Sequence, residues 1–378
     1  MNTPYYVYDI EILKKRIDDI KKELPDIPLT YSIKANSFVL DSISEEVSHV
    51  EVCSPGELHI CKKLSLNPDK IIYSGVMKEE TDIYEAISYG VHILTAESKR
   101  HFSLISKIAQ ELGKTVNVIF RISSDNQFGM DPDDIYEIVS KRDEYQNVNL
   151  YGYHFYSGTQ KRKIKQIESD IETIEKVVNA CKEGCGFVPE LVEYGPGLAV
   201  EYFKENNEVA DKELLLEVAP ILCDFAERVP LGIEMGRFVV SSCGSYYTSV
   251  KDIKNNYGIN YVILDGGIHQ LKYYGQIMAM HSPIIVQNNE RGEEKQKYCL
   301  CGSLCTVADV LAKEAELYEL QLDDVLEFKK CGAYSLTESS SLFLSRDMPS
   351  VYLKENGDIK KVRGFVDSSE INTTGYKV

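Results

Sequence analysis

Short apolar runs alternate with longer amphipathic segments over the first two thirds of the chain. The amphipathic segments, such as 98–112 and 165–181, place apolar residues three and four positions apart, which predicts helices. The apolar runs predict eight strands: Leu29–Ile33, Val50–Cys53, Lys70–Ser74, His92–Thr95, Thr115–Ile122, Leu150–His154, Leu191–Tyr194 and Leu231–Glu234. Eight β–α units in about 210 residues predict an α/β fold, a (β/α)8 TIM-like barrel, with an open doubly wound sheet as the alternative.

The pattern changes near residue 240 to short strands separated by glycine, asparagine and charged turns, which predicts a mostly β domain. A first strand at Tyr5–Tyr8 could join either domain. We expect residues 1–25 to join the β domain, 26–240 to form the barrel and 241–378 to form the β domain. Its expected strands are Val239–Asp252, Tyr261–Leu264, Ile284–Gln287, Lys297–Cys301, Val325–Lys329, Ser350–Leu353 and Lys360–Phe365.

Composition narrows the class of protein. The 378 residues are 43% hydrophobic and 27% charged, which is ordinary for a globular protein with a sizeable core. The 59 acidic residues exceed the 42 basic ones, and the net charge of −17 argues against binding to nucleic acid or to an anionic membrane surface. No apolar run reaches the roughly 18 residues of a transmembrane helix, and the start of the chain lacks the pattern of a signal peptide.

Ten cysteines are scattered along the chain without a CxxC pair, and the closest cluster is Cys299, Cys301 and Cys305. A long chain with this pattern and no export signal usually keeps free thiols. We therefore expect a reducing cytoplasm and no metal site, with disulfides or zinc as the alternatives.

Lys34 directly follows the predicted strand Leu29–Ile33, within the segment Tyr31–Asn36 (YSIKAN). In a barrel, functional groups lie at the carboxyl ends of the strands. A lysine partly removed from water there has a lowered pKa, which makes its amine a competent nucleophile for Schiff-base chemistry. A surface lysine that extends its stem along the barrel mouth is the alternative.

Further candidate groups follow the last predicted strands. Gly195 and Gly197 can present backbone N–H groups to a phosphate, although a barrel turn also needs glycine. Arg237 supplies a bidentate donor where barrels favour phosphate, and Glu234 can hold a protonated ring nitrogen or form a structural pair with Arg237. Cys305 lies in a turn-like stretch before an expected helix, and a buried apolar role is its alternative.

Together these segments resemble the fold-type III pyridoxal-phosphate decarboxylases, the diaminopimelate and ornithine decarboxylase family, along the whole chain. The resemblance implies an alanine racemase-like fold and pyridoxal 5'-phosphate as the cofactor. The matching motifs, in chain order, are Tyr31-Ser-Ile-Lys-Ala-Asn36, Ser54-Pro-Gly-Glu57, Gly195-Pro-Gly-Leu198, Glu234-Met-Gly-Arg237, Cys305 and Gly332-Ala-Tyr334.

The resemblance also implies a role for each matching residue. Lys34 would hold the cofactor covalently, Glu234 would bind its pyridinium nitrogen, and Arg237 would bind its phosphate. Cys305 would be a catalytic cysteine that the partner subunit contributes across a homodimer interface. The other implied contacts to the cofactor are Tyr156, Gly195, Gly197, Leu198, Gly236 and Tyr334, and those to the substrate are His154 and Thr306.

Three departures from the family bear on the substrate. The histidine that stacks on the cofactor ring is replaced by Tyr156, which can still stack there. The acid that grips a distal ammonium is replaced by Thr306, and the arginine–proline motif that helps to bind diaminopimelate is missing near Leu271–Gly275. Segments 156–160, 193–197, 265–270 and 278–280 look more like the branch of the butirosin-pathway decarboxylase, which acts on glutamate held as a thioester on an acyl carrier protein.

This branch implies a biosynthetic enzyme that removes the α-carboxylate of a carrier-bound aminoacyl thioester. A decarboxylase of free diaminopimelate, ornithine or lysine is the first alternative, and a racemase on the same cofactor and a non-catalytic regulatory homologue are others. Carrier proteins are acidic, so the run Lys161–Lys165 (KRKIK) predicts a basic docking patch at the barrel rim, with a solvated helix start as the alternative.

Overall fold

The computed structural model describes residues 1–203 and 207–376, and the chain folds into two compact units. The first, which we call the barrel unit, comprises Ile17–Ala199 and Asp211–Phe238. The second, the β unit, comprises Met1–Arg16, Val200–Ala210 and Val239–Val378. The division runs through helices α1 (Ile10–Glu23) and α8 (Asn207–Ala226), and the domain limits expected at residues 25 and 240 stay a prediction.

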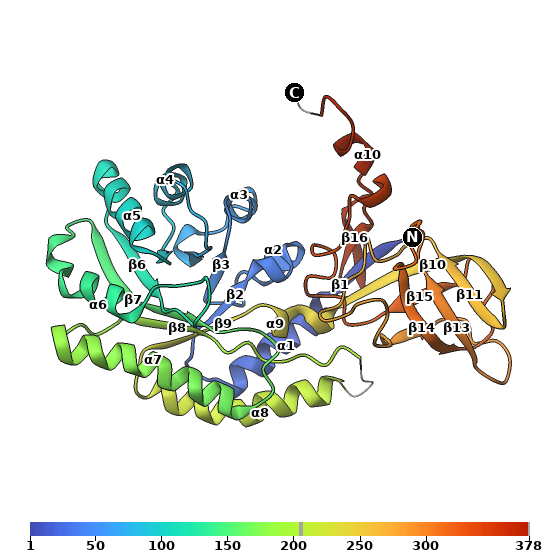
Figure 1. The fold of residues 1–378 in the computed structure, drawn as a ribbon, viewed down its shortest axis with the longest axis horizontal. Helices are drawn as coiled ribbons and strands as arrows, with labels where there is room; N and C mark the ends of the chain where they lie inside the picture. Colours follow the sequence, from blue (N-terminus) through green and yellow to red (C-terminus); the bar gives the residue numbers. More distant parts are fainter. Residues whose placement is uncertain (204–206, 377–378) are drawn as a thin grey trace. The chain divides into compact units, whose positions relative to one another are not determined.

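The barrel unit contains a closed ring of eight parallel strands, β2 to β9 (Figure 1). The ring closes because β2 pairs with β9 as well as with β3, which rules out the open sheet. Strands that are buried on both faces tolerate continuous apolar runs, so each predicted run forms a strand and the barrel prediction is confirmed. The strands are β2 Leu29–Ser32, β3 His49–Val52, β4 Ile71–Tyr73, β5 Ile93–Ala96, β6 Val116–Arg121, β7 Val148–Tyr156, β8 Leu191–Gly195 and β9 Leu231–Met235.

Helix α5 (Lys99–Leu112) illustrates how the amphipathic segments fold. The Ser98 hydroxyl accepts a hydrogen bond from the His101 N–H and caps the first turn. Gly113, at φ 62°, ends the helix in the left-handed region, and Ile105 and Ile108 lie on its buried face. The barrel unit also contains α2 Leu40–Ile43, α3 Pro55–Lys63, α4 Glu80–Tyr89, α6 Pro132–Ser140 and α7 Ile164–Cys185.

Apolar side chains fill the inside of the barrel. Ile72, Ile93, Ile119 and Leu191, from four different strands, pack together and are almost fully buried, with Tyr151 against them. A barrel filled in this way is a packed core and not a pore. Polar groups that act on a ligand must therefore lie at the ends of the strands.

The β unit is built on a nine-stranded sheet. Its main path runs β14-β13-β11-β10-β1-β16-β17, and β15 pairs with both β10 and β12. Strand β1 (Tyr5–Asp9) lies between β10 and β16, so the first strand of the chain belongs to this sheet. The others are β10 Gly244–Asn256, β11 Ile259–Leu264, β12 Ile285–Gln287, β13 Gln296–Cys301, β14 Val310–Leu317, β15 Val325–Phe328, β16 Ser350–Glu355 and β17 Asp358–Arg363, and the short helix α10 Ser368–Ile371 follows.

Two sequence predictions for the β unit were wrong. The strand expected from Val239 begins only at Gly244, because helix α9 (Arg237–Val240) and a 3-10 turn precede it. The helix expected after Cys305 is strand β14, whose sequence VLAKEAEL is rich in helix-forming residues. Antiparallel pairing with β13 buries Leu311, Ala315 and other apolar side chains of β14, and this tertiary contact overrides a weak local preference.

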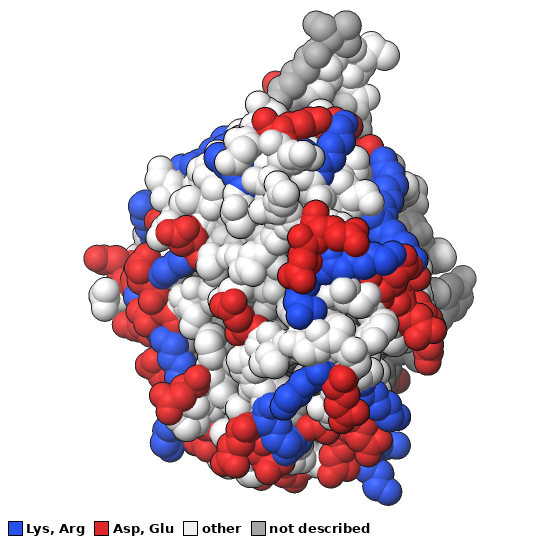
Figure 2. All heavy atoms as spheres, turned by 90° about the vertical axis from the view of Figure 1, so that its left-hand side faces the viewer, with Lys and Arg blue, Asp and Glu red and all other residues white. Residues whose placement is uncertain are grey.

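Among the described residues, no helix is long and apolar enough to cross a membrane. Figure 2 shows one face of the molecule, on which acidic and basic side chains are interspersed. That face lacks the continuous positive surface that binding to a nucleic-acid backbone requires.

His269, in the β unit, is a buried histidine whose protonation should weaken the fold. It is fully buried, and neither ring nitrogen has a hydrogen-bond partner in the described part of the chain. Burial lowers its pKa from 6.5 to about 4, and the nearby Arg346 adds to this shift. The unfolded chain therefore takes up this proton at a higher pH than the folded one, so stability is complete above pH 6.5 and falls as the pH drops toward 4.

We expect the variant His269→Leu to lose less stability on acidification than the parent protein. Between the two pKa values, the slope of the unfolding free energy against pH should differ between the two proteins by the contribution of one proton, about 1.4 kcal/mol per pH unit. Urea unfolding of both proteins at several pH values between neutral and mildly acid measures it. Identical pH dependence in the two proteins would contradict the assignment to His269.

Candidate active site

Lys34 lies in a short 3-10 turn directly after strand β2, at the carboxyl end of the barrel. Its Nζ atom is 2.7 Å from Oε2 of Glu51 and 3.4 Å from Oε1 of Glu234, and it lies 3.5 Å from Sγ of Cys53. The Lys34 side chain is 39% exposed, whereas the two carboxylates are almost fully buried. The amine is therefore held by two charges yet remains open to a ligand.

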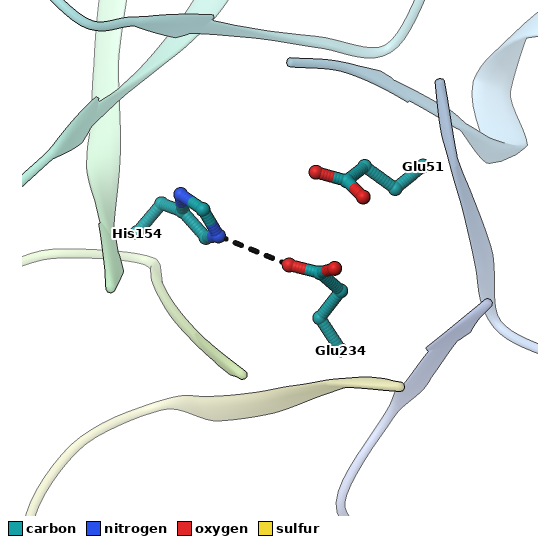
Figure 3. Close-up of side chains that lie close together, drawn as sticks. All are labelled: Glu51, His154 and Glu234. Atoms are coloured by element: carbon teal, nitrogen blue, oxygen red, sulfur yellow. Dashed lines mark hydrogen bonds and ion pairs between the residues drawn. The ribbon is translucent and has the colours of Figure 1, made fainter. Parts of the chain in front are cut away.

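Glu234, on β9, is bound on both sides. The Ser32 hydroxyl donates to Oε1, and Nε2 of His154 lies 3.1 Å from Oε2 (Figure 3). Burial acts to raise the pKa of Glu234, but Lys34 and His154 outweigh it and hold the pKa well below its usual range. The Glu234 carboxylate thus stays ionised inside the barrel and can pair with a positive charge.

Glu51, His154 and Glu234 place one donor atom each within 4.8 Å of one another, and Figure 3 shows their side chains directed toward a common space. Carboxylate oxygens and imidazole nitrogens are also the ligands of divalent metals. Here the ammonium group of Lys34 contacts both carboxylates and supplies the positive charge. We therefore assign the cluster to the lysine.

Glu193, on β8, is a third buried carboxyl group of the barrel, in register with His154. Neither of its oxygens makes a well-formed hydrogen bond to another described residue, and the nearby Thr30 hydroxyl acts to lower its pKa. Burial raises the pKa of Glu193 well above its usual range, and the carboxylates of Glu234 and Glu51 raise it further. Environment therefore divides these groups into an ionised Glu234 and a neutral Glu193, a contrast typical of active sites.

The glycine turn after β8 packs so closely on the loop after β7 that Gly195 and Gly197 have no space for side chains. A Cβ atom on Gly195 would lie 2.7 Å from the ring of Tyr156, so this ring packs directly on the backbone. Gly197 has φ +60°, and a Cβ atom there would come within 1.9 Å of the carbonyl oxygen of Gly158. The turn between Tyr156 and Leu198 can therefore be built only with glycine at this position.

Asp170, on helix α7, anchors this turn from inside the barrel unit. It accepts hydrogen bonds from Nζ of Lys161, from the Ser157 hydroxyl at 2.8 Å and from the Tyr194 hydroxyl at 2.7 Å. The backbone N–H of Lys161 in turn donates to the carbonyl of Gly197 at 2.9 Å. A buried ion pair thus holds the backbone of the glycine turn.

The same contact corrects the predicted docking patch. Lys161 is buried and paired with Asp170, so it does not belong to the surface. Arg162, Lys163 and Lys165 are exposed at the start of α7. The run of basic residues alone could not reveal that its first member has a structural role.

Arg237 begins helix α9 on the segment after β9. Its Nε donates to the Thr159 hydroxyl at 3.2 Å, which brings it beside the loop after β7. A Cβ atom on Gly236 would lie 3.1 Å from that of Ala35 and 3.2 Å from that of Ser32. The Arg237 segment therefore packs closely on the segment that carries Lys34.

Cys305, Thr306 and Tyr334 belong to the β unit. Cys305 is exposed, Thr306 is half-buried, and Tyr334 has a φ of 62°, in the left-handed region. Within the barrel unit the predicted residues make these contacts: Lys34 and His154 meet Glu234, Tyr156 packs on Gly195, Gly197 and Leu198 meet the loop after β7, Gly236 packs on the segment of Lys34, and Arg237 binds Thr159. That the three residues of the β unit join them stays a prediction.

Sequence reasoning missed Glu51, Glu193 and Lys78. Glu51 and Glu193 each interrupt an apolar barrel strand, and a charge in such a run was the available signal. Lys78 is fully buried after β4 and donates to the carbonyl of Gly75, and burial lowers its pKa to about 8. Its predecessors in the chain, Val76 and Met77, are exposed, so nothing in the pattern marked it.

The motif Ser54–Glu57 has a structural role in the barrel unit. The Ser54 hydroxyl accepts from the Glu57 N–H at 3.2 Å, and a Glu57 carboxylate oxygen accepts from the Cys53 N–H at 2.6 Å. Ser54 thus caps the first turn of α3, and Glu57 of that turn binds back to the residue before the cap. This bond holds Cys53, which contacts the Lys34 amine.

The described groups fit pyridoxal 5'-phosphate. Lys34 offers an accessible amine, Glu234 an ionised carboxylate suited to a protonated ring nitrogen, and His154 has a buried Nδ1 without a partner among the described residues. The glycine turn and Arg237 offer N–H donors to a phosphate. The fold and the site define an enzyme of the pyridoxal-phosphate class.

Comparison with known proteins gives the family. Residues 10–241 match the family described as pyridoxal-dependent decarboxylase, pyridoxal binding domain. The chain belongs to this family, and it is a pyridoxal-phosphate-dependent decarboxylase. For the fold, a crystal structure of AQ1208 from Aquifex aeolicus is similar with a TM-score of 0.85 and 25% identity, covering 98% of this chain and 90% of that one.

Three relatives with named activities are similar over nearly their whole length. The diaminopimelate decarboxylase of Aquifex aeolicus is 28% identical, over 96% of this chain and 89% of that protein. The 2-[(L-alanin-3-ylcarbamoyl)methyl]-2-hydroxybutanedioate decarboxylase of Staphylococcus aureus is 29% identical, over 93% and 94%. The L-glutamyl-[BtrI acyl-carrier protein] decarboxylase of Niallia circulans is 27% identical, over 96% and 91%.

Proposed function

We propose that this decarboxylase removes the α-carboxylate of an amino acid whose far end is bound to a carrier protein as a thioester. The observation that carries the proposal is the neutral residue Thr306. It stands where the family has an acidic residue that binds the distal ammonium group of the substrate. A desolvated ammonium needs a carboxylate partner. The relative that acts on a glutamyl carrier protein supports the same choice.

Asp309, an acidic residue of the same loop, does not take over the role of the acid that Thr306 replaces. Asp309 is buried, and its carboxylate accepts the N–H groups of Ile268 at 2.8 Å and Leu304 at 2.7 Å. Within 301–310 it is the only acidic residue. A free diamino acid would therefore find no available carboxylate in this loop.

Lys34, Glu234, Arg237, Tyr156, Tyr334 and the glycine turn at 195–198 would hold the cofactor, with Gly236 supporting them. When bound, pyridoxal phosphate supplies an electron sink for the bond that breaks. Glu234 would keep a proton on the ring nitrogen of the bound cofactor, because its carboxylate is ionised. His154 orients Glu234 through their contact at 3.1 Å.

The α-carbon that loses carbon dioxide must receive a proton. Cys305, or the amine of Lys34, would donate it as a general acid. Cys305 is exposed on its own chain, which suits a residue that serves the active site of a partner subunit. We propose a homodimer with shared active sites.

The dimer proposal has a direct test. With Cys305 as the proton donor, Lys34→Ala and Cys305→Ala proteins should each be nearly inactive. An equal mixture that exchanges subunits should regain about a quarter of the parent activity, because half of the dimers are mixed and each has one intact site. Carbon dioxide release measures it. Mixed dimers isolated with two different tags and found inactive would contradict the shared site.

Decarboxylation of free diaminopimelate, ornithine or lysine is the second candidate, because the Aquifex relative is named for the first of these. A non-catalytic regulatory role is opposed by the intact set of Lys34, Glu234, Arg237 and Cys305. A reducing cytoplasm, expected from the scattered cysteines, stays a prediction.

The deciding experiment measures carbon dioxide release from glutamyl carrier protein and from free diaminopimelate, ornithine, lysine and arginine. We expect turnover of the carrier-bound substrate and little turnover of the free diamino acids. Brisk release from any free diamino acid would overturn the carrier-bound proposal and leave the decarboxylase assignment intact.

A further inference from the structure

The β unit contains an apolar cavity of about 360 Å³. That volume lies within the usual range for small-molecule sites, which are mostly apolar with a few polar groups. The segment 268–279 forms one wall, and the start of β14 forms another. Its apolar lining includes Leu271, Tyr273, Ile277, Met278, Val310 and Leu311.

The mouth of the cavity exposes apolar side chains on an unusual backbone. Ile277 is 66% exposed and Met278 is 51% exposed. Met278 and Ala279 have φ angles of 46° and 53°, in the left-handed region that non-glycine residues seldom adopt. Such conformations concentrate at ligand-binding segments, where the surroundings hold them in place.

Among the described residues that line the cavity, every charged group is paired. Its two charged lining residues, Lys272 and Glu338, lie 3.7 Å apart as an ion pair. Gln276 is also engaged, because its side chain exchanges hydrogen bonds with the backbone of His281. The lining therefore suits a neutral ligand, and Ser339 and Ser340 at its edge can bond to amide groups.

This cavity adjoins the loop that carries the predicted substrate residues. Ala308 lines it, and the Ala308 N–H donates to the Thr306 hydroxyl at 3.3 Å. Asp309 ties the two walls together through its bonds to Ile268 and Leu304. A ligand in the cavity would thus extend away from the loop of Cys305 and Thr306.

We propose that this cavity binds the neutral arm that joins the substrate to its carrier, a chain of methylene and amide groups such as pantetheine. The inference rests on the proposed function, since it assumes a tethered amino acid. Methylene groups would bury apolar surface against Leu271, Met278 and Leu311, while the amides meet the polar edge. The arm would take the place of the distal charge that other members of the family recognise.

The test compares the charge variants Met278→Glu and Met280→Glu in the cofactor-loaded enzyme. Met280 is 67% exposed and does not line the cavity, so it is a matched control. Calorimetry measures the binding of glutamyl-pantetheine, with a stable amide in place of the thioester, and of free glutamate. We expect Met278→Glu to weaken binding of the pantetheine compound at least about tenfold, with Met280→Glu and the binding of free glutamate unchanged.

Three outcomes would overturn the proposal. The first is that the parent enzyme binds the pantetheine compound no more tightly than free glutamate. This result would overturn the cavity proposal even if carbon dioxide release from the carrier-bound substrate upheld the proposed function. Equal loss in both variants would mean a general charge effect. A changed oligomeric state of Met278→Glu, with unchanged affinity for the pantetheine compound, would assign this surface to a second copy of the chain.

Discussion

Replacing Lys34 with alanine should remove the visible absorbance of the purified protein and lower decarboxylation by at least about 10²- to 10⁴-fold. The amine of Lys34 is the accessible group at the barrel mouth, held between Glu51 and Glu234. Absorbance of the protein as isolated and carbon dioxide release measure the two effects. An unchanged absorbance band in the variant would refute covalent attachment at this residue.

The variant Lys34→Arg separates the loss of the amine nucleophile from the loss of the positive charge that stabilises the fold. Arginine keeps the positive charge between Glu51 and Glu234, whereas alanine leaves two buried carboxylates without it, which is destabilising. We expect both variants to lose the absorbance band and only Lys34→Ala to unfold at lower urea concentration. Retention of the band in Lys34→Arg would count against the assignment, because a guanidinium stays protonated and is no amine nucleophile.

Glu234→Gln should lower kcat by about 10²- to 10³-fold, the usual cost of removing one electrostatic group from an active site. Glutamine keeps the shape and can still bond to Ser32 and His154, but it cannot hold a proton on a ring nitrogen. Steady-state kinetics at saturating cofactor measures the loss. Activity within a few-fold of the parent would show that the negative charge is not required.

Glu193→Gln is the matched control. Burial and the neighbouring carboxylates keep Glu193 protonated, so an amide resembles its native state. We expect kcat to change little at neutral pH, in contrast to Glu234→Gln. If the two substitutions had equal effects, the division into an ionised and a neutral carboxyl group would be wrong.

The barrel was predictable because its strands are buried on both faces and produce continuous apolar runs. Helices such as α5 were predictable because a capping serine and a terminal glycine frame an amphipathic segment. Strand β14 was not, since its residues favour a helix locally and only pairing with β13 makes them extended. Long-range pairing leaves little trace in a single sequence.

The residues of the candidate site also fall into those that the sequence could predict and those that it could not. Lys34, Glu234 and Arg237 stand at strand ends in recognisable motifs, so they could be named in advance. Glu51 was marked only by a charge within an apolar run, and its role depends on a 2.7 Å contact with Lys34, which the sequence does not show. Lys161 looked like a surface cation, and only the position of Asp170 shows that it is buried.

The bonds around Asp170 also bear on how the barrel opens. They join helix α7, strand β8 and the loop after β7 to one carboxylate, and through Lys161 they reach the backbone of Gly197. Segments linked by buried bonds tend to open together in local unfolding. We therefore expect amide hydrogens of the glycine turn to exchange at the same rate as those of the first turns of α7, so that local unfolding of this helix would also release the glycine turn.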